Sequence, residues 1–151
     1  MNFHIGSLLS LEKPLRATFK LLISILKLQG RVLLPGSKEQ VIEELRKSKI
    51  FYFSSNYEGL SNSMIEALCV GLAIITTKVS GTEDFIKENK NGFLLEKKNV
   101  DGMKKAIRKL ISDESLRKII GDNNRQQAKI FKIENIFHQW ENIINKEVNQ
   151  K

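Results

Sequence analysis

Two carboxylates lie on either side of a short polar segment near the middle of the chain. Glu58 precedes this segment, and Glu66 follows Glu58 after seven intervening residues. A carboxylate accepts hydrogen bonds from two neighbouring hydroxyl groups, such as those of a ribose or a pyranose ring. Hydrogen bonds to a charged group contribute about 1.5–3 kcal/mol each. The pair therefore suits a ligand that carries a polyol at each end.

The residues between the two carboxylates suit an anion. Gly59 allows the backbone to approach a ligand closely, and Ser61, Asn62 or Ser63 can cap a helix that starts here. The free N–H groups and the dipole at a helix start favour a phosphate. Hydroxyl groups at both ends with phosphate between them describe a nucleotide-sugar.

The same residues also have an ordinary structural interpretation. The segment from Ser63 to Glu66 fits a capping box, in which Glu66 only accepts a hydrogen bond from a backbone N–H. Glu58 followed by Gly59 fits a plain turn. Spacing alone does not decide between ligand binding and local structure.

Short strands that alternate with helices must position these residues. The expected strands are 3–5, 50–53, 73–77 and 93–95, and the expected helices are 14–29, 38–47, 62–70, a short turn at 83–88, and three more from Val100 onward, the second of them capped by Ser112-Asp113. This alternation predicts an α/β fold, a single Rossmann-like domain with a parallel sheet flanked by helices. Ligands of such sheets bind at the carboxyl ends of the strands.

Composition limits the classes of partner and compartment. The 151 residues suffice for one domain, and the net charge of +8 favours a negatively charged partner: a nucleic acid, an anionic membrane surface or a phosphorylated ligand. A solvated basic face explains the charge equally well. The single cysteine, Cys69, lies in an apolar stretch and is expected to be buried, which suits a reducing, cytoplasmic compartment. No secretory signal is visible, and the apolar run 15–28 is too short and too charged to span a bilayer.

The segment from Glu58 to Glu66 resembles the E-x7-E signature of retaining GT-B glycosyltransferases, especially glycosyltransferase family four. Further matches follow in the family's order: Gly71 to Thr77 with Ala73 in place of the usual proline, Gly81-Thr82-Glu83, Asn91-Gly92, Asp113 to Gly121, and Trp140 in the closing helix. The resemblance runs from Val32 to about Ile144. It implies the C-terminal, donor-binding half of a GT-B fold.

The resemblance also implies roles for individual residues. Glu58, the catalytic candidate, would sit beside the transferred sugar, and Glu66 would hold the ribose hydroxyls. The remaining donor-binding candidates are Lys13, the backbone amides of Gly59, Leu60, Ser61 and Asn62, and the loop at Gly36, near which the base would stack. No cofactor and no metal are expected, in agreement with the lack of an Asp-x-Asp motif.

The start of the chain departs from the family pattern. Lys13 occupies the place of the family's phosphate-binding lysine, whereas Ser7 stands where the family has an arginine, which should weaken donor binding. Only 18 residues separate Lys13 from Val32, enough for one helix, so we expect one strand of the family pattern to be absent before Val32. We therefore divide the chain into a divergent or shortened start at 1–30, a nucleotide-sugar-binding domain at 31–145 and a polar tail at 146–151.

These considerations lead to one main hypothesis and its alternatives. The chain is expected to be the donor-binding half of a glycosyltransferase that transfers a sugar, with retention, to a glycan or a lipid-linked acceptor in the cytoplasm or at the inner face of the membrane. The alternative is a non-catalytic subunit or remnant that needs a separate acceptor-binding domain. In the family the closing helix packs on that domain, so the Trp140 face would lack its partner here. The segment 15–28 could contact a membrane or a partner peripherally. No motif supports nucleic-acid binding.

Overall fold

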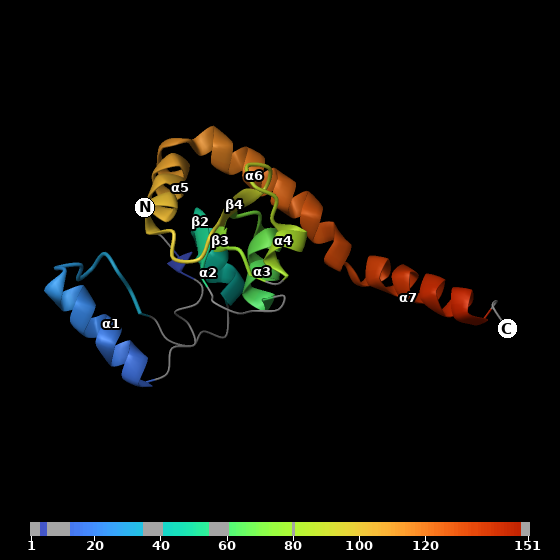
Figure 1. The fold of residues 1–151 in the computed structure, drawn as a ribbon, viewed down its shortest axis with the longest axis horizontal. Helices are drawn as coiled ribbons and strands as arrows, with labels where there is room; N and C mark the ends of the chain where they lie inside the picture. Colours follow the sequence, from blue (N-terminus) through green and yellow to red (C-terminus); the bar gives the residue numbers. More distant parts are fainter. Residues whose placement is uncertain (1–3, 6–12, 35–40, 55–60, 80, 149–151) are drawn as a thin grey trace.

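The computed structural model describes residues 4–5, 13–34, 41–54, 61–79 and 81–148 (Figure 1). Its four strands form one parallel sheet in chain order: β1 (His4–Ile5), β2 (Ile50–Phe53), β3 (Ala73–Thr77) and β4 (Gly92–Leu95). The helices are α1 (Lys13–Ile25), α2 (Val41–Lys47), α3 (Asn62–Val70), α4 (Thr82–Phe85), α5 (Val100–Ser112), α6 (Glu114–Gln127), the short 3-10 helix η2 (Ala128–Phe131) and α7 (Ile133–Val148). The expected α/β fold with a parallel sheet flanked by helices is confirmed.

Two apolar cores cover the two faces of the sheet. Successive side chains of a strand point to opposite faces, and β2 shows this directly, because Phe51 and Phe53 pack with α2 and α3 whereas Ile50 packs with α5 and α6. The same alternation places Ile74 in the first core and Ile75 in the second. All five residues of β3 are buried, as expected for a strand covered on both faces.

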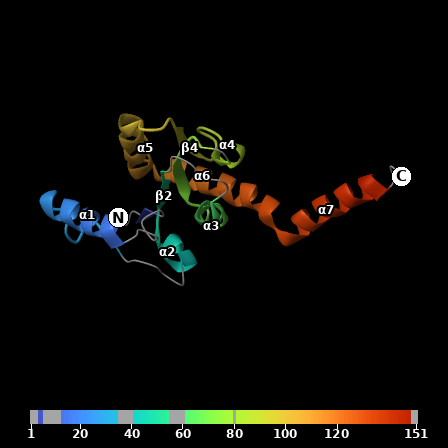
Figure 2. The same cartoon turned by 60° about the horizontal axis from the view of Figure 1, so that its bottom comes forward.

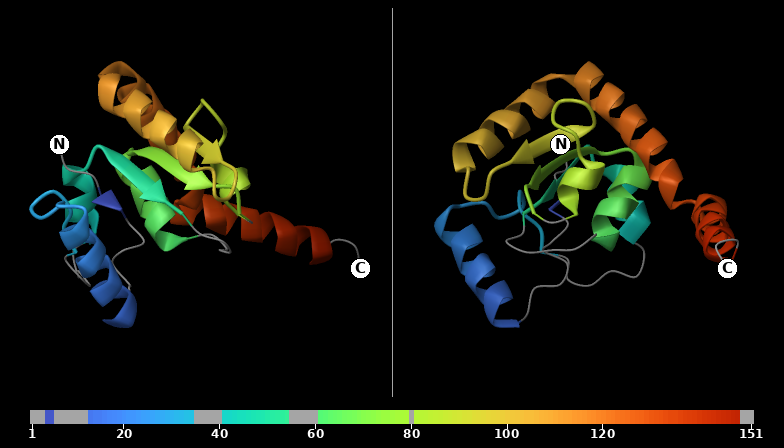
Figure 3. Two further views of the ribbon diagram at one scale, coloured as in Figure 1. Left: turned by 60° about the vertical axis from the view of Figure 1, so that its left-hand side comes forward. Right: turned by 45° about the vertical axis from the view of Figure 1, so that its right-hand side comes forward.

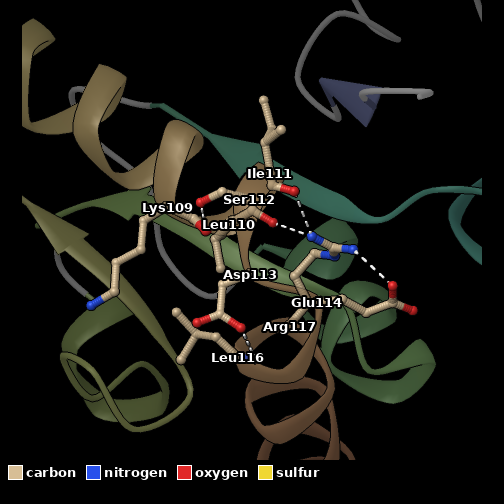
Figure 4. A network of polar contacts seen from close by, with 8 residues as sticks. All are labelled: Lys109, Leu110, Ile111, Ser112, Asp113, Glu114, Leu116 and Arg117. Atoms are coloured by element: carbon tan, nitrogen blue, oxygen red, sulfur yellow. Dashed lines mark hydrogen bonds and ion pairs between the residues drawn. The ribbon is translucent and has the colours of Figure 1, made fainter.

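The junction between α5 and α6 is fixed by polar contacts (Figure 4). Asp113 caps α6 by accepting a hydrogen bond from the Leu116 N–H at 2.8 Å, which confirms the cap expected at this position. Arg117 donates to the carbonyl oxygens of Leu110 and Ile111, two groups that the end of α5 leaves without a helical partner. These contacts set the turn by which α6 follows α5.

Helix α1 ends earlier than the sequence pattern indicates. We expected the helix to run to about Gln29 and to stop at Gly30, but it stops at Ile25. Lys27 takes a positive φ of 53°, and the Leu28 N–H bonds to the Ile23 carbonyl at 2.9 Å. This is the pattern of a Schellman C-cap, formed here without glycine at the left-handed position.

Helices α1 and α7 lie on opposite sides of the body formed by the sheet and its other helices (Figures 1 and 2). Both carry large apolar side chains that are exposed, among them Ile25 on α1 and Trp140 on α7. None of the described helices is long and apolar enough to cross a membrane.

Candidate functional site

The carboxyl ends of the strands meet at one edge of the sheet, because all four strands run parallel. Strand β2 ends at Phe53 and is followed, after 54–60, by Ser61 and α3. Strand β3 ends at Thr77 and is followed by α4, and β4 ends at Leu95. The candidate site at this edge therefore consists of the segments that leave β2, β3 and β4.

Helix α3 begins with backbone hydrogen-bond donors that have no acceptor among the described residues. Ser61 occupies the N-cap position with extended backbone angles and makes no side-chain cap bond, since its hydroxyl lies 2.8 Å from the Ser63 hydroxyl instead. The first bonds within the helix run from Met64 and Ile65 to the Ser61 carbonyl. The N–H groups of Asn62 and Ser63 have no acceptor within the described part of the chain, which leaves them available to an anion.

Glu66 lies on the side of α3 that faces away from the core. The core side of the helix is formed by Met64, Ala67 and Leu68, all of which are fully buried. At 100° per residue Glu66 points almost opposite to them, and its side chain is half-buried. It has no hydrogen-bond or ion-pair partner among the residues that the structure describes.

The capping-box interpretation of Glu66 is wrong. A capping box needs Ser63 outside the helix as its N-cap, but α3 starts at Asn62, with Ser61 as N-cap. Ser63 is thus already inside the first turn, and Glu66 stands too far along the helix to bond the N-cap. The ordinary structural role that competed with ligand binding is therefore removed.

The expectation that Cys69 is buried is also wrong, since the cysteine is exposed. Cys69 stands three residues after Glu66 and seven after Asn62, so all three share the outer side of α3. The apolar run around Cys69 misled the sequence analysis, because its neighbours Ala67 and Leu68 supply the buried side on their own.

The turn after β3 is held by Thr82, a residue to which the sequence analysis gave no role. The Thr82 hydroxyl is fully buried, accepts a hydrogen bond from the Val79 N–H at 3.1 Å and lies 3.1 Å from the Thr77 carbonyl oxygen. Gly81 precedes it with a φ of 85°, a conformation that favours glycine. The Gly-Thr pair was noticed only as part of the resemblance, and a buried threonine hydroxyl has no signal in the sequence.

Lys78 and Glu96 join the ends of β3 and β4. Their Nζ and Oε1 atoms lie 2.6 Å apart, and the Lys78 N–H donates to the Leu95 carbonyl at 2.8 Å. The hydrogen bond to Glu96 and its charge raise the pKa of Lys78 above its ordinary value. The sequence analysis missed this lysine, although a charged residue directly after a buried strand is a usable signal for the ligand edge of a parallel sheet.

The structure describes only some of the predicted site residues, and the binding roles of all of them stay predictions. Ser61 and Asn62 lie at the start of α3, and Glu66 follows Asn62 by about one turn on the same side of the helix. Lys13 is the first residue of α1, and only its place in the helix is described. Glu58, Gly59, Leu60 and Gly36 lie outside the described residues, so their roles stay predictions.

Two surface hollows lined by described residues lie away from this edge. One, of about 230 Å³, is lined by polar residues that include Asn91 and Asn123, next to the amino end of β4. The other lies along α7 at Ile133 and Phe137. Within the described ranges no three His, Cys, Asp or Glu side chains gather as metal ligands, and the expectation that donor binding needs no metal stays a prediction.

Comparison with known proteins places the chain in a family of glycosyl transferases. A family model described as glycosyl transferases group 1 matches residues 4–127. The capsular polysaccharide biosynthesis glycosyltransferase CapM of Staphylococcus aureus is 36% identical over 97 residues, which cover 64% of this chain and 26% of CapM. The N-acetylgalactosamine-N,N'-diacetylbacillosaminyl-diphospho-undecaprenol 4-alpha-N-acetylgalactosaminyltransferase of Campylobacter jejuni is 31% identical over 121 residues, or 80% of this chain and 33% of that protein.

Solved structures agree with the observed fold. The crystal structure of HepE from Anabaena in complex with UDP superposes with a TM-score of 0.80 at 20% identity, covering 87% of this chain and 36% of HepE. The chain thus spans about a quarter to about a third of the length of the two curated relatives described above.

Proposed function

Since the chain belongs to the group 1 glycosyl transferases, we propose that it binds a nucleoside-diphosphate sugar at the carboxyl edge of its sheet and supplies the donor-binding half of a retaining glycosyl transfer. The observation that carries the proposal is Glu66, a half-buried carboxylate on the outer side of α3. Among the described residues neither this carboxylate nor the N–H groups of Asn62 and Ser63 at the start of the helix has a hydrogen-bond partner. The HepE structure, which contains UDP, supports a nucleotide in this fold. CapM, which is named for capsular polysaccharide biosynthesis, supports a glycan as the product.

Each residue of the site has a distinct task in this proposal. Glu66 accepts hydrogen bonds from two ribose hydroxyls, and the N–H groups of Asn62 and Ser63 face the diphosphate. Lys13 places one positive charge beside the diphosphate. The second positive charge of the family pattern, an arginine, is missing because Ser7 stands at its position. Glu58 stands beside the transferred sugar.

The transfer itself exchanges one glycosidic bond for another. The bond between the anomeric carbon and the diphosphate oxygen breaks, and the acceptor oxygen bonds to the anomeric carbon on the same face of the ring. The leaving phosphate takes the acceptor's proton. Interactions that grow with the charge on the leaving diphosphate accelerate this step, because they are stronger in the transition state than in the bound substrate.

Ligand-observed NMR with UDP, GDP and ADP tests the proposal on the purified chain. We expect one nucleotide to bind and Glu66→Ala to weaken binding about 10–100-fold, which corresponds to the ~1.4–2.8 kcal/mol of charged hydroxyl contacts. Glu134→Ala, which removes an exposed carboxylate from α7, is the matched control and should leave binding unchanged. If the folded chain binds none of the three nucleotides, or both variants weaken binding equally, the proposal fails.

The exposed stripe of α7 favours a second proposal, that transfer requires an acceptor-binding half. The stripe consists of large apolar side chains on one side of the helix: Ile133, Ile136, Phe137, Trp140, Ile143 and Ile144. Uncovered apolar surface of this extent is typical of an interface, and the relatives described above are about three to four times as long as the matched region. We expect the chain alone to show little or no transfer, and turnover comparable to that of ordinary enzymes would contradict this. The cytoplasmic location and the absence of nucleic-acid binding stay predictions.

A further inference from the structure

Helix α1 has an exposed apolar side and a basic side. Leu21 and Ile25 are separated by one helical turn and are 61% and 64% exposed, and the neighbouring Leu22 and Leu26 form a second exposed pair. Arg16 and Lys20 lie on the opposite side of the helix, again one turn apart. The helix is therefore amphipathic with its apolar side turned to solvent, the reverse of a helix that packs on a core.

The body of the protein does not cover this apolar side. Helix α1 stands apart from the sheet and its flanking helices in Figure 1 and in the right-hand view of Figure 3. The Arg16 guanidinium donates to the Leu34 carbonyl at 2.5 Å, so the segment that follows the helix folds back along it. Leu33 in that segment is also exposed.

The charge around the apolar side has one sign. From Lys13 to Lys38 the sequence contains no Asp or Glu, while Arg16, Lys20, Lys27 and Arg31 place positive charge on the basic side of α1 and on the segment that follows it. Helix α7 differs, because its exposed stripe is accompanied by the acidic Glu134 and Glu141. An anionic surface would attract α1 and would gain nothing from α7.

We propose that α1 binds the surface of an anionic lipid membrane, with Leu21, Leu22, Ile25 and Leu26 inserted among the acyl chains and the basic side chains at the headgroups. A helix of 13 residues is about 20 Å long, so it lies in the plane of the interface rather than across the bilayer. Its lysine and arginine stems extend toward the anionic headgroups while the leucines enter the apolar layer. This inference does not depend on donor binding.

Vesicle flotation of the full chain tests the proposal. Vesicles of phosphatidylcholine alone are compared with vesicles that contain about one third phosphatidylglycerol, a fraction high enough to give the negative surface potential that attracts basic segments. We expect binding to the anionic vesicles that falls steeply with added salt. The double variant Leu21→Gln/Ile25→Gln and the double variant Lys20→Glu/Lys27→Glu should each weaken binding at least tenfold, whereas their matched controls, Ile133→Gln/Ile143→Gln on α7 and Lys105→Glu/Lys118→Glu on α5 and α6, should not.

Two fluorescence measurements identify the helix that inserts. Trp140 is the only tryptophan and reports on α7, so its emission should not shift on adding vesicles. A polarity-sensitive dye on Ile25→Cys in a Cys69→Ser background should shift to the blue. Equal binding to both vesicle types, an inserted Trp140, or self-association that Leu21→Gln/Ile25→Gln abolishes without any vesicle binding would each overturn the proposal, the last in favour of contact between two copies.

Discussion

The Asn124 side-chain amide donates a hydrogen bond to the Leu72 carbonyl oxygen, 2.7 Å away, and so fixes α6 to the segment between α3 and β3. Close by, Arg125 donates to the Val70 carbonyl at 3.1 Å at the end of α3. The position of α3, and with it that of Glu66, therefore depends on α6. These two bonds fix the carboxyl end of α3, and the candidate site lies toward its amino end.

Removing the amide of Asn124 should destabilise the whole body. Asn124→Asp keeps the shape but replaces the donor with a buried carboxylate that faces a carbonyl oxygen, at a cost of at least about 1–3 kcal/mol. Urea unfolding followed by circular dichroism measures this loss. Asn123→Asp is the control, because Asn123 makes a similar bond to the Lys90 carbonyl at a solvent-exposed position and should cost less than about 1.5 kcal/mol. Equal losses would contradict the importance of the buried contact.

Gly121→Ala should destabilise the chain although alanine favours helices. In an ordinary helix the change stabilises by up to about 1 kcal/mol. Here a Cβ on Gly121 would collide with the Gly71 carbonyl, a backbone group that cannot rotate away, and Gly71 is itself fixed in the left-handed conformation at φ 78°. We expect a loss of about 1–3 kcal/mol in thermal or urea unfolding. Ser115→Ala, at an exposed position of the same helix, should change stability by less than about 0.5 kcal/mol, and a stabilising Gly121→Ala would disprove the close approach.

The pair of Lys78 and Glu96 should be visible in a titration. Because Glu96 stabilises the charged ammonium, the Lys78 side chain should titrate above its ordinary pKa of 10.5, and Glu96→Gln should bring the midpoint back down. The pKa of Lys78 is higher in the folded than in the unfolded state, so the pair stabilises the fold fully at pH values below the unfolded-state pKa. This contribution to stability is lost as the pH rises through the folded-state pKa. NMR of the lysine ε-methylene groups checks this, with exposed Lys105 as the reference. A Lys78 midpoint that Glu96→Gln leaves in place would contradict the pairing.

Cys69 should react with a maleimide in the native chain. Its thiol is exposed on the outer side of α3, three residues from Glu66, so labelling should reach completion without denaturant, and mass spectrometry gives the extent. If labelling required unfolding, the helix would be rotated and the outward direction of Glu66 would be wrong as well. The experiment thus tests the orientation of α3 independently of any ligand.

Much of the fold could be predicted because its signals are local. Strand β3 begins with three apolar residues and contains four β-branched ones, a composition that favours a strand, and Gly71 ends α3 in the left-handed conformation expected of a glycine C-cap. The end of α1 could not be predicted, since Lys27 adopts a positive φ that its residue type does not favour. The exposure of Cys69 could not be predicted for a different reason. In a short helix with apolar residues on several sides, the sequence does not show which side faces the core, so a buried and an exposed position are easily interchanged.

The site was predictable as a pattern but not as a geometry. The spacing of Glu58 and Glu66 singled out α3 as the candidate helix. The segment from Ser63 to Glu66 also fitted a capping box, and only the start of α3 at Asn62 removed that interpretation. Thr82 and Lys78 follow β3, and the pairing of β2 with β3 places them at the same edge as the start of α3, while Lys78 also pairs with Glu96 after β4. Contacts of this kind do not produce a periodic pattern in the sequence, so they could not be predicted from it.

The central claim is that a nucleotide binds at the carboxyl edge of the sheet, against the outer side of α3. Backbone amide chemical shifts, recorded while the nucleotide found to bind is titrated into labelled protein, test it most directly. The account predicts that the largest changes fall on Asn62, Ser63 and Glu66 and on Lys78, Gly81 and Thr82, while Asn91 and Asn123 in the hollow beside the amino end of β4 stay constant. Changes confined to that hollow, or to α7, would contradict the claim.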